Sequence, residues 1–171
     1  KLIADYLEKT HAYYHQVKVP EIETLIKEMV IGCYTQKSNI VLLENFFNEY
    51  KQQLLNHTKR EEDVVFPYAL AIEEAFNNKN YDSKIISLME SYSMDIFKSE
   101  HDNIEEKLFD LKNIIIKYLP QPKDARLCNK LLFELFFLEQ DINDHSRIEE
   151  KVFVPKVREM EKIIKEQIAA N

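Results

Sequence analysis

Apolar residues recur at intervals of three and four along four long segments of the chain, and helix-breaking sequences separate these segments. The segments cover residues 2–29, 40–76, 83–118 and 124–154, and a tail follows Pro155. Such a period marks one apolar face of an α-helix. Four segments of this length joined by short loops predict an all-α protein, an antiparallel up-and-down four-helix bundle.

The ends of the segments carry recognisable signals. The sequence GCYTQKSN from Gly32 ends the first, and NNKN, which has low helix propensity, ends the second. Pro120 and Pro122 stop the third, because proline cannot continue a helix. Asp124 is a suitable N-cap for the fourth, and Pro155 is expected to kink or end that helix.

Several positions where the stripes predict an apolar residue hold an ionisable one. The inward positions are expected to be Leu7, His11 and Tyr14 in the first segment; Leu43, Phe46, Tyr50, Leu54, His57, Glu61, Val64 and Tyr68 in the second; Met94, Phe97, His101, Ile104, Leu108, Leu111 and Ile115 in the third; and Leu131, Leu135, Leu138, Ile142, His145, Glu149 and Val152 in the fourth. Burying an ionisable group costs several kcal/mol unless it is paired or binds a metal.

One phrase occurs twice. HTKREEDVVFP at 57–67 returns as HSRIEEKVFVP at 145–155, with five of eleven positions identical. His57 and His145 are 88 residues apart, and His101 lies 44 from each. In helices that run up and back, this spacing returns each histidine to about the same level of the bundle. The first helix contributes His11, which lies 46 residues before His57.

These residues are the candidate metal ligands. A single inward histidine is more often a hydrogen-bonded core residue, and a single His-x-x-x-Glu is often a surface pair, but the recurrence on four helices favours a metal. The set exceeds one tetrahedral zinc site and suits two borderline ions such as iron. Ferritin-like Glu-x-x-His spacing occurs only at Glu8–His11, so that pattern is disfavoured. The predicted ligands are His11, His57, Glu61, His101, His145 and Glu149.

Composition narrows the partners. The chain has 171 residues, enough for a single domain, with one Gly and five Pro and a net charge of −7. That charge argues against nucleic acid as a partner, and no apolar run or signal peptide indicates a membrane. Cys33 and Cys128 lack a CxxC companion, so ordinary thiols in a cytoplasmic protein are expected, with a disulfide between them as the alternative. Because the chain begins at Lys1, a fragment of a longer protein with a further N-terminal domain is an open expectation.

HTKREEDVVFP, SEHDNIEEKL and DHSRIEEKVFVP together resemble the helix motifs of the hemerythrin-like (HHE cation-binding) domain family. The likeness covers nearly the whole chain and is greatest to the bacterial repair-of-iron-centres di-iron proteins. It implies a hemerythrin-like bundle and two iron ions in a non-haem, oxo- or hydroxo-bridged di-iron centre that meets O2, NO or peroxide. It also implies a part in the stress response.

The chain departs from that family in three places. In THAYYHQVKVP, His11 and His15 both approach the position of the first-helix ligand, and the apolar stripe favours His11. Oxygen-carrying hemerythrins have a second histidine where this chain has Glu105. This glutamate would bind a metal ion, leave one coordination position of the metal open, or face solvent. The N-terminal Cys-Cys domain of the repair proteins is not part of these 171 residues. Glu150 is the alternative to Glu149 in the fourth helix.

Other polar residues have secondary roles in this interpretation. Tyr14, Tyr50 and Tyr68 are expected to pack in the core, with hydrogen bonds near the metal as the alternative. Asp141, one turn before His145, could orient its imidazole. The second glutamates of the twin phrases, Glu62 and Glu150, are expected to face outward.

The leading hypothesis is a metal- and small-ligand-binding protein that binds or senses O2 or NO, or takes part in iron-centre repair. An enzyme alternative is a di-iron peroxidase or an NO-reducing enzyme with an open position beside Glu105. A third is a structural bundle that holds zinc and serves a protein partner. The pattern predicts neither which ligand is physiological nor the oligomeric state.

Overall fold

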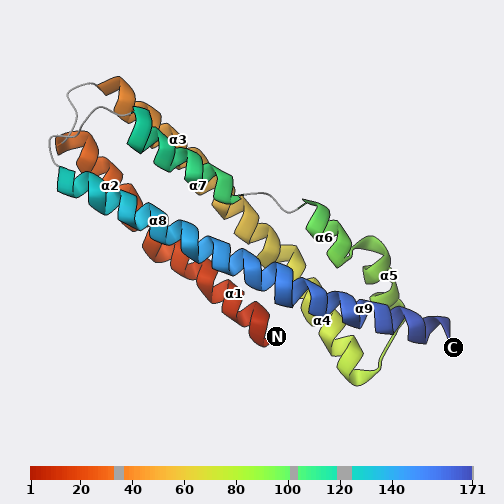
Figure 1. Ribbon diagram of the computed structural model, residues 1–171. Helices are drawn as coiled ribbons and strands as arrows, with labels where there is room; N and C mark the ends of the chain where they lie inside the picture. Colours follow the sequence, from red (N-terminus) through yellow and green to blue (C-terminus); the bar gives the residue numbers. More distant parts are fainter. Residues whose placement is uncertain (33–36, 101–103, 119–124, 171) are drawn as a thin grey trace. The chain divides into compact units, whose positions relative to one another are not determined.

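A computed structural model describes residues 1–32, 37–100, 104–118 and 125–170, and the regular structure in these ranges is helical throughout (Figure 1). This confirms the all-α prediction. None of the helices described is both long and apolar enough to cross a bilayer. The α-helices are α1 (Leu2–Tyr13), α2 (Val19–Gly32), α3 (Lys37–Arg60), α4 (Phe66–Asn78), α5 (Ser83–Ser91), α6 (Met94–Glu100), α7 (Ile104–Asn113), α8 (Ala125–Ile148) and α9 (Val154–Ala169).

Short π-helical turns extend or join these α-helices. They are η1 (Tyr14–Lys18), η2 (Glu61–Val65), η3 (Ile114–Tyr118) and η4 (Glu149–Phe153). Three of them connect two α-helices directly, so that helical structure is continuous over residues 2–32, 37–78 and 125–169. The first two predicted helices therefore exist much as expected. The fourth begins at Ala125, next to the predicted cap Asp124, which lies outside the described residues.

Each π-helical turn begins six residues before a proline. In an α-helix proline removes one backbone hydrogen bond and its ring crowds the preceding turn. Here the turn before the proline closes by five residues instead of four: the N–H of Val154, for example, donates to the carbonyl of Glu149. The first residues of the turns and their prolines are Tyr14 and Pro20, Glu61 and Pro67, Ile114 and Pro120, and Glu149 and Pro155, of which Pro120 lies outside the described residues.

The predicted end of the fourth helix at residue 154 is wrong for this reason. Pro155 sits in the first turn of α9, where a backbone N–H has no partner within the helix in any case. The preceding π-helical turn absorbs the change of register. The segment expected to be a tail is therefore a helix, and it buries Val157, Met160 and Ile164.

The third predicted helix, over 83–118, is interrupted and is wrong as a single element. It starts at Ser83 as expected, where the carboxylate of Asp82 accepts from the N–H groups of Lys84 and Ile85 at 3.0 Å. The backbone at Tyr92 is extended, and α6 starts again at Met94. The N–H of Met94 donates to Glu161 of α9 at 3.0 Å, so a buried carboxylate caps the new helix.

The π-helical turns also explain why two residues that were predicted to face the core are exposed instead. Val64 and Val152 were expected to face the core but are 42% and 46% exposed, whereas the next residues, Val65 and Phe153, are buried. A π-helical turn holds one residue more than an α-helical turn, so the apolar stripe moves on by one position within it.

Ahead of η2 the stripe on α3 departs from prediction for a different reason. Phe47 and Thr58 are buried, whereas Phe46 and His57, which were expected to point inward, are half-buried. The expected positions followed a seven-residue repeat, whereas a straight helix has 3.6 residues per turn and drifts away from that repeat. The buried positions are Leu43, Phe47, Tyr50, Leu54, Thr58, Glu61 and Val65.

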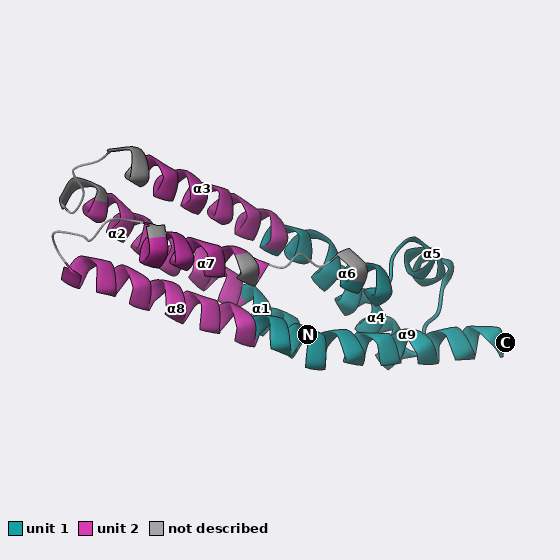
Figure 2. Cartoon of the chain, turned by 45° about the horizontal axis from the view of Figure 1, so that its top comes forward, with its two compact units in different colours: residues 1–8, 58–102, 145–171 teal, residues 9–57, 103–144 magenta. Residues whose placement is uncertain are grey.

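The chain divides into two compact units, each with its own apolar core (Figure 2). Unit 1 comprises residues 1–8, 58–102 and 145–171, and unit 2 comprises residues 9–57 and 103–144. The core of unit 2 draws on four helical stretches: η1 with α2, then α3, α7 with η3, and α8. The core of unit 1 draws on the start of α1, η2 with α4, α5 with α6, and η4 with α9. The prediction of a single domain stays a prediction.

Candidate metal centre

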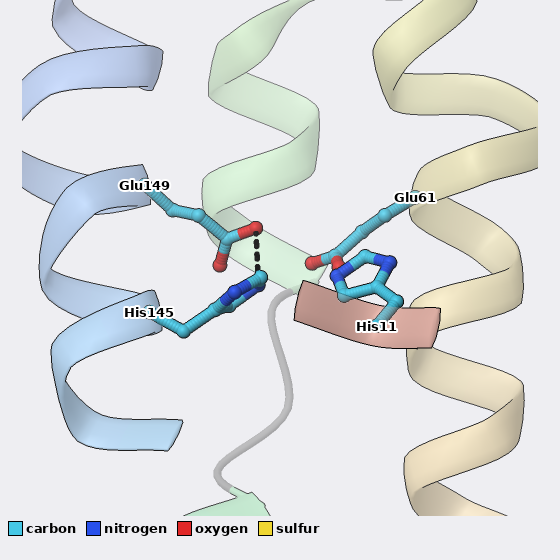
Figure 3. Close-up of side chains that lie close together, drawn as sticks. All are labelled: His11, Glu61, His145 and Glu149. Atoms are coloured by element: carbon cyan, nitrogen blue, oxygen red, sulfur yellow. Dashed lines mark ion pairs between the residues drawn. The ribbon is translucent and has the colours of Figure 1, made fainter. Parts of the chain in front are cut away.

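Four of the predicted ligands form one buried cluster. His11, Glu61, His145 and Glu149 each offer one donor atom, and these atoms all lie within 4.8 Å of one another. The side chains are between 0% and 6% exposed. They are called the four-residue cluster below (Figure 3).

Local structure explains how these residues meet. His11 lies in the last turn of α1, and Glu61 is the first residue of η2. His145 and Glu149 are one turn apart on the helix formed by α8 and η4, and Figure 3 shows both side chains pointing toward Glu61 and His11. The spacing of four residues brings the Nε2 atom of His145 to 3.3 Å from the Oε1 atom of Glu149.

The size of the four-residue cluster suits one metal ion with little rearrangement. Bonds from a divalent ion to imidazole nitrogen or carboxylate oxygen are about 2.0–2.2 Å, so two donors on one ion lie at most about 4.4 Å apart. The observed limit of 4.8 Å is only slightly larger. Two imidazoles and two carboxylates form a mixed nitrogen and oxygen set, which suits iron, zinc or manganese better than calcium or magnesium.

The charges of the cluster also favour a cation. Glu61 and Glu149 are each 1% exposed, so both carboxylates have lost nearly all contact with bulk water. Two carboxylates this close in a poorly solvated site repel each other. A divalent ion between them would offset both the repulsion and the lost hydration, and it would turn an unfavourable arrangement into a binding site.

His57 and His101 are the two predicted ligands outside the four-residue cluster. His57 is half-buried because Thr58 takes the inward position on α3. It thus differs from His145, its counterpart in the repeated phrase, although both precede a buried glutamate by four residues. His101 lies outside the described residues.

The alternatives to the predicted ligands are placed as follows. His15 is half-buried and does not belong to the four-residue cluster. Glu150 and its counterpart Glu62 are exposed, which confirms that both face outward. The side chain of Glu105, on α7, lies outside the part of the structure that is described.

The three tyrosines are buried, as predicted. Tyr68 has a partner that the sequence did not suggest: its hydroxyl donates to the Oε1 atom of Glu161 at 2.5 Å. Burial, together with this bond, raises the pKa of the Tyr68 hydroxyl well above its usual range. Asp141 is half-buried, and burial raises the pKa of its carboxyl, while the nearby charge of Lys18 opposes the shift.

Glu161 and two buried lysines were missed by the sequence analysis. Glu161 occupies the apolar stripe of α9 between Val157 and Ile164, which is the same signal that identified the histidines, but the helix was expected to end before it. Lys18 and Lys112 are 8% and 4% exposed. Most lysines on a helix keep their charged end in water, so the sequence alone does not distinguish a buried lysine from a solvent-facing one.

No protein-family model matches this chain, and neither a curated protein nor a solved structure matches it. Function is therefore inferred from the residues and their geometry.

Proposed function

We propose that this chain is a non-haem di-iron protein of the hemerythrin-like kind, which binds or senses O2 or NO or takes part in iron-centre repair. The observation that carries the proposal is the four-residue cluster, in which two imidazoles and two carboxylates converge in a buried position. Iron bound there would supply reversible redox chemistry and a coordination position for a small diatomic ligand.

The proposal gives each protein group a definite task. Glu61 and Glu149 point toward each other in Figure 3, and their carboxylates would supply the negatively charged oxygen donors of the metal site. His11 and His145 would add ring nitrogens, and in Figure 3 the His145 ring lies beside Glu149 and the His11 ring beside Glu61. Burial keeps bulk water away, so the charge of the carboxylates acts on the ions with little screening.

A second ion needs more donors than the four-residue cluster holds. We assign these to His57 and His101, which the repeated phrase and the 44-residue spacing predict to lie at the same level. A rotation of the His57 side chain, which is half-buried, would be required. His101 is assigned on the sequence pattern alone.

The corresponding fold is an antiparallel up-and-down four-helix bundle. Two features support it: the core of each unit is built from four helical stretches, and the segments predicted from the apolar stripes are helical. Short connections between long helices favour antiparallel neighbours.

Metal content per chain tests the function directly. The full chain is made in iron-supplemented medium and its metals are quantified, with near-UV and visible spectra taken before and after exposure to air and then with NO on the reduced protein. We expect about two irons per chain, as in other di-iron bundles, and absorption bands that change with O2 or NO.

The chain offers matched controls for this measurement. Glu61→Gln and Glu149→Gln should lose iron, whereas Glu62→Gln and Glu150→Gln remove the same charge from exposed neighbours and should retain it. His57→Ala and His101→Ala should each reduce the content toward one ion. One zinc per chain with a featureless spectrum would contradict the redox function and leave a structural metal site.

A further inference from the structure

Helix α8 is apolar on its outer side as well as on its inner side. Residues 131–138 read LLFELFFL. Leu131, Leu135 and Leu138 enter the core of unit 2, yet Phe133, Phe136 and Phe137 remain 65%, 49% and 41% exposed. A helix that is hydrophobic all round is normally covered on every side.

The exposed phenylalanines of α8 contact one another or a lysine within unit 2, on the two flanks of the helix. Phe133 and Phe137 stack with ring centroids 6.4 Å apart. The Nζ atom of Lys112 lies 3.9 Å from the centre of the Phe136 ring and 6.0 Å from that of Phe109 on α7. The surface formed by Tyr13, Phe109, Phe133, Phe136 and Phe137 is called the aromatic band below.

The same arrangement occurs on the other flank of α8. The Nζ atom of Lys18 lies 4.8 Å from the centre of the Phe137 ring and 5.9 Å from that of Tyr13 on α1. Each flank of α8 therefore consists of a buried lysine between a phenyl ring of α8 and an aromatic ring of a neighbouring helix.

Both lysines are neutralised within the chain. The Nζ atom of Lys18 lies 2.9 Å from the Oε2 atom of Glu134 and 3.3 Å from that of Glu21, and Lys112 pairs with Glu139. Covering the aromatic band would therefore bury no uncompensated cation. The band therefore offers little unpaired positive charge to attract an acidic partner.

The area of the band is that of a modest protein interface. A phenylalanine or tyrosine buries about 200 Å² in a core, so the exposed fractions of the five rings correspond to roughly 500 Å² of aromatic surface. This is near the upper end for the largest apolar patch of a monomer and lies below the roughly 800 Å² that each partner contributes to a standard interface.

We propose that the aromatic band is the contact surface of a homodimer, in which α8 of one copy packs against α8 of a second copy of this chain. A two-fold interface must be self-complementary, and the aromatic surface on both flanks of α8 meets that requirement. Each copy carries a net charge of −7, so contact through a neutral patch brings the fewest like charges together. We expect a weak dimer, with a dissociation constant of about 1–100 μM, because the area is below that of a standard interface. The dimer does not depend on the metal centre.

Sedimentation equilibrium of the full chain tests the proposal, between about 1 and 100 μM and at low and high salt. We expect a monomer–dimer equilibrium that salt strengthens, because the copies repel each other at low ionic strength. Phe133→Asp should raise the dissociation constant at least about tenfold, as does removal of an aromatic anchor from an interface.

Val41→Asp is the matched control, because it places the same charge on α3 at a residue that is 51% exposed and outside the band. It should leave the dimer unchanged. Circular dichroism checks that each variant folds, and Phe133→Gln replaces Phe133→Asp if the latter does not.

Three outcomes would overturn the proposal. The first is a wild-type chain that stays monomeric at 100 μM. The second is a dimer that survives both substitutions of Phe133. The third is a monomer that binds phosphatidylcholine vesicles through the band, with binding lost in Phe133→Asp, because the apolar surface would then serve a lipid surface instead.

Discussion

Glu61 and Glu149 occupy equivalent positions: each is the first residue of a π-helical turn, each lies six residues before a proline, and both point into the same buried cluster. π-helical turns frequently interrupt α-helices at functional sites. In this chain the turn, the proline and the buried carboxylate form one recurring local structure, so the repeated phrase has a structural basis as well as a chemical one.

Removing one of the two facing carboxylates should act in opposite directions on stability and on metal binding. Without metal, Glu61→Gln relieves the repulsion from Glu149, and we expect the free energy of unfolding to rise by about 1 kcal/mol. With metal, the same variant should bind more weakly. Urea unfolding with and without EDTA separates the two effects, and Glu62→Gln should show neither. Lower stability of metal-free Glu61→Gln would contradict this account of the site.

The shift of the apolar stripe within η2 can be measured with two adjacent valines. Val65 is fully buried, so Val65→Ala should lower the free energy of unfolding by about 2 kcal/mol through lost burial and a cavity. Val64 is 42% exposed, and Val64→Ala should change it by no more than about 0.5 kcal/mol. The reverse order in chemical denaturation would mean that the helix is a regular α-helix through residues 61–65.

The buried pair of Lys18 and Glu134 should behave as a unit. Their side chains are 11% and 12% exposed, so Lys18→Met leaves a largely desolvated carboxylate, and we expect a loss of about 3 kcal/mol. Glu134→Leu combined with Lys18→Met should recover most of that loss, because no buried charge is then left over. A double-mutant cycle measures the coupling, and simple additivity of the two changes would show that the pair contributes nothing.

Tyr68 should make stability fall at alkaline pH. Burial and the bond to Glu161 raise the pKa of its hydroxyl in the folded state, whereas the unfolded chain loses this proton near pH 10. Its contribution is thus complete below pH 10 and declines above it, by up to about 1.4 kcal/mol per pH unit. Tyr68→Phe should lose this part of the pH dependence and about 1 kcal/mol at neutral pH. Equal alkaline slopes for the two proteins would exclude the effect.

The apolar period was enough to predict the first two helices, the start of the fourth and most of the buried faces. It placed Leu7, His11 and Tyr14 correctly, and it identified the other three members of the four-residue cluster as buried. These predictions succeed because the cost of burying a charged group is large, so an ionisable residue on an apolar stripe is a strong signal.

The misses have specific causes. A single-residue change of phase leaves no mark on an apolar period averaged over a long helix, so Val64 and Val65 could not be told apart. Proline commonly ends a helix, but it is also compatible with the first turn of a continuing helix, and Pro155 therefore does not reveal that α9 follows and carries Glu161. Contacts between distant segments, such as Tyr68 with Glu161, depend on the fold itself and have no local sequence signal.

The π-helical turns also bear on how this chain can tolerate changes in its length. Each is in effect a one-residue insertion that the helix has absorbed, so deleting Asp63 would restore an α-helix and leave the residues after it on nearly their present faces. Helices seldom survive such an edit without losing their buried face. Here both halves would keep their buried faces, the ligand-bearing half with Glu61 and the half that packs against α9, because the deletion removes only the residue that the π-helical turn had added.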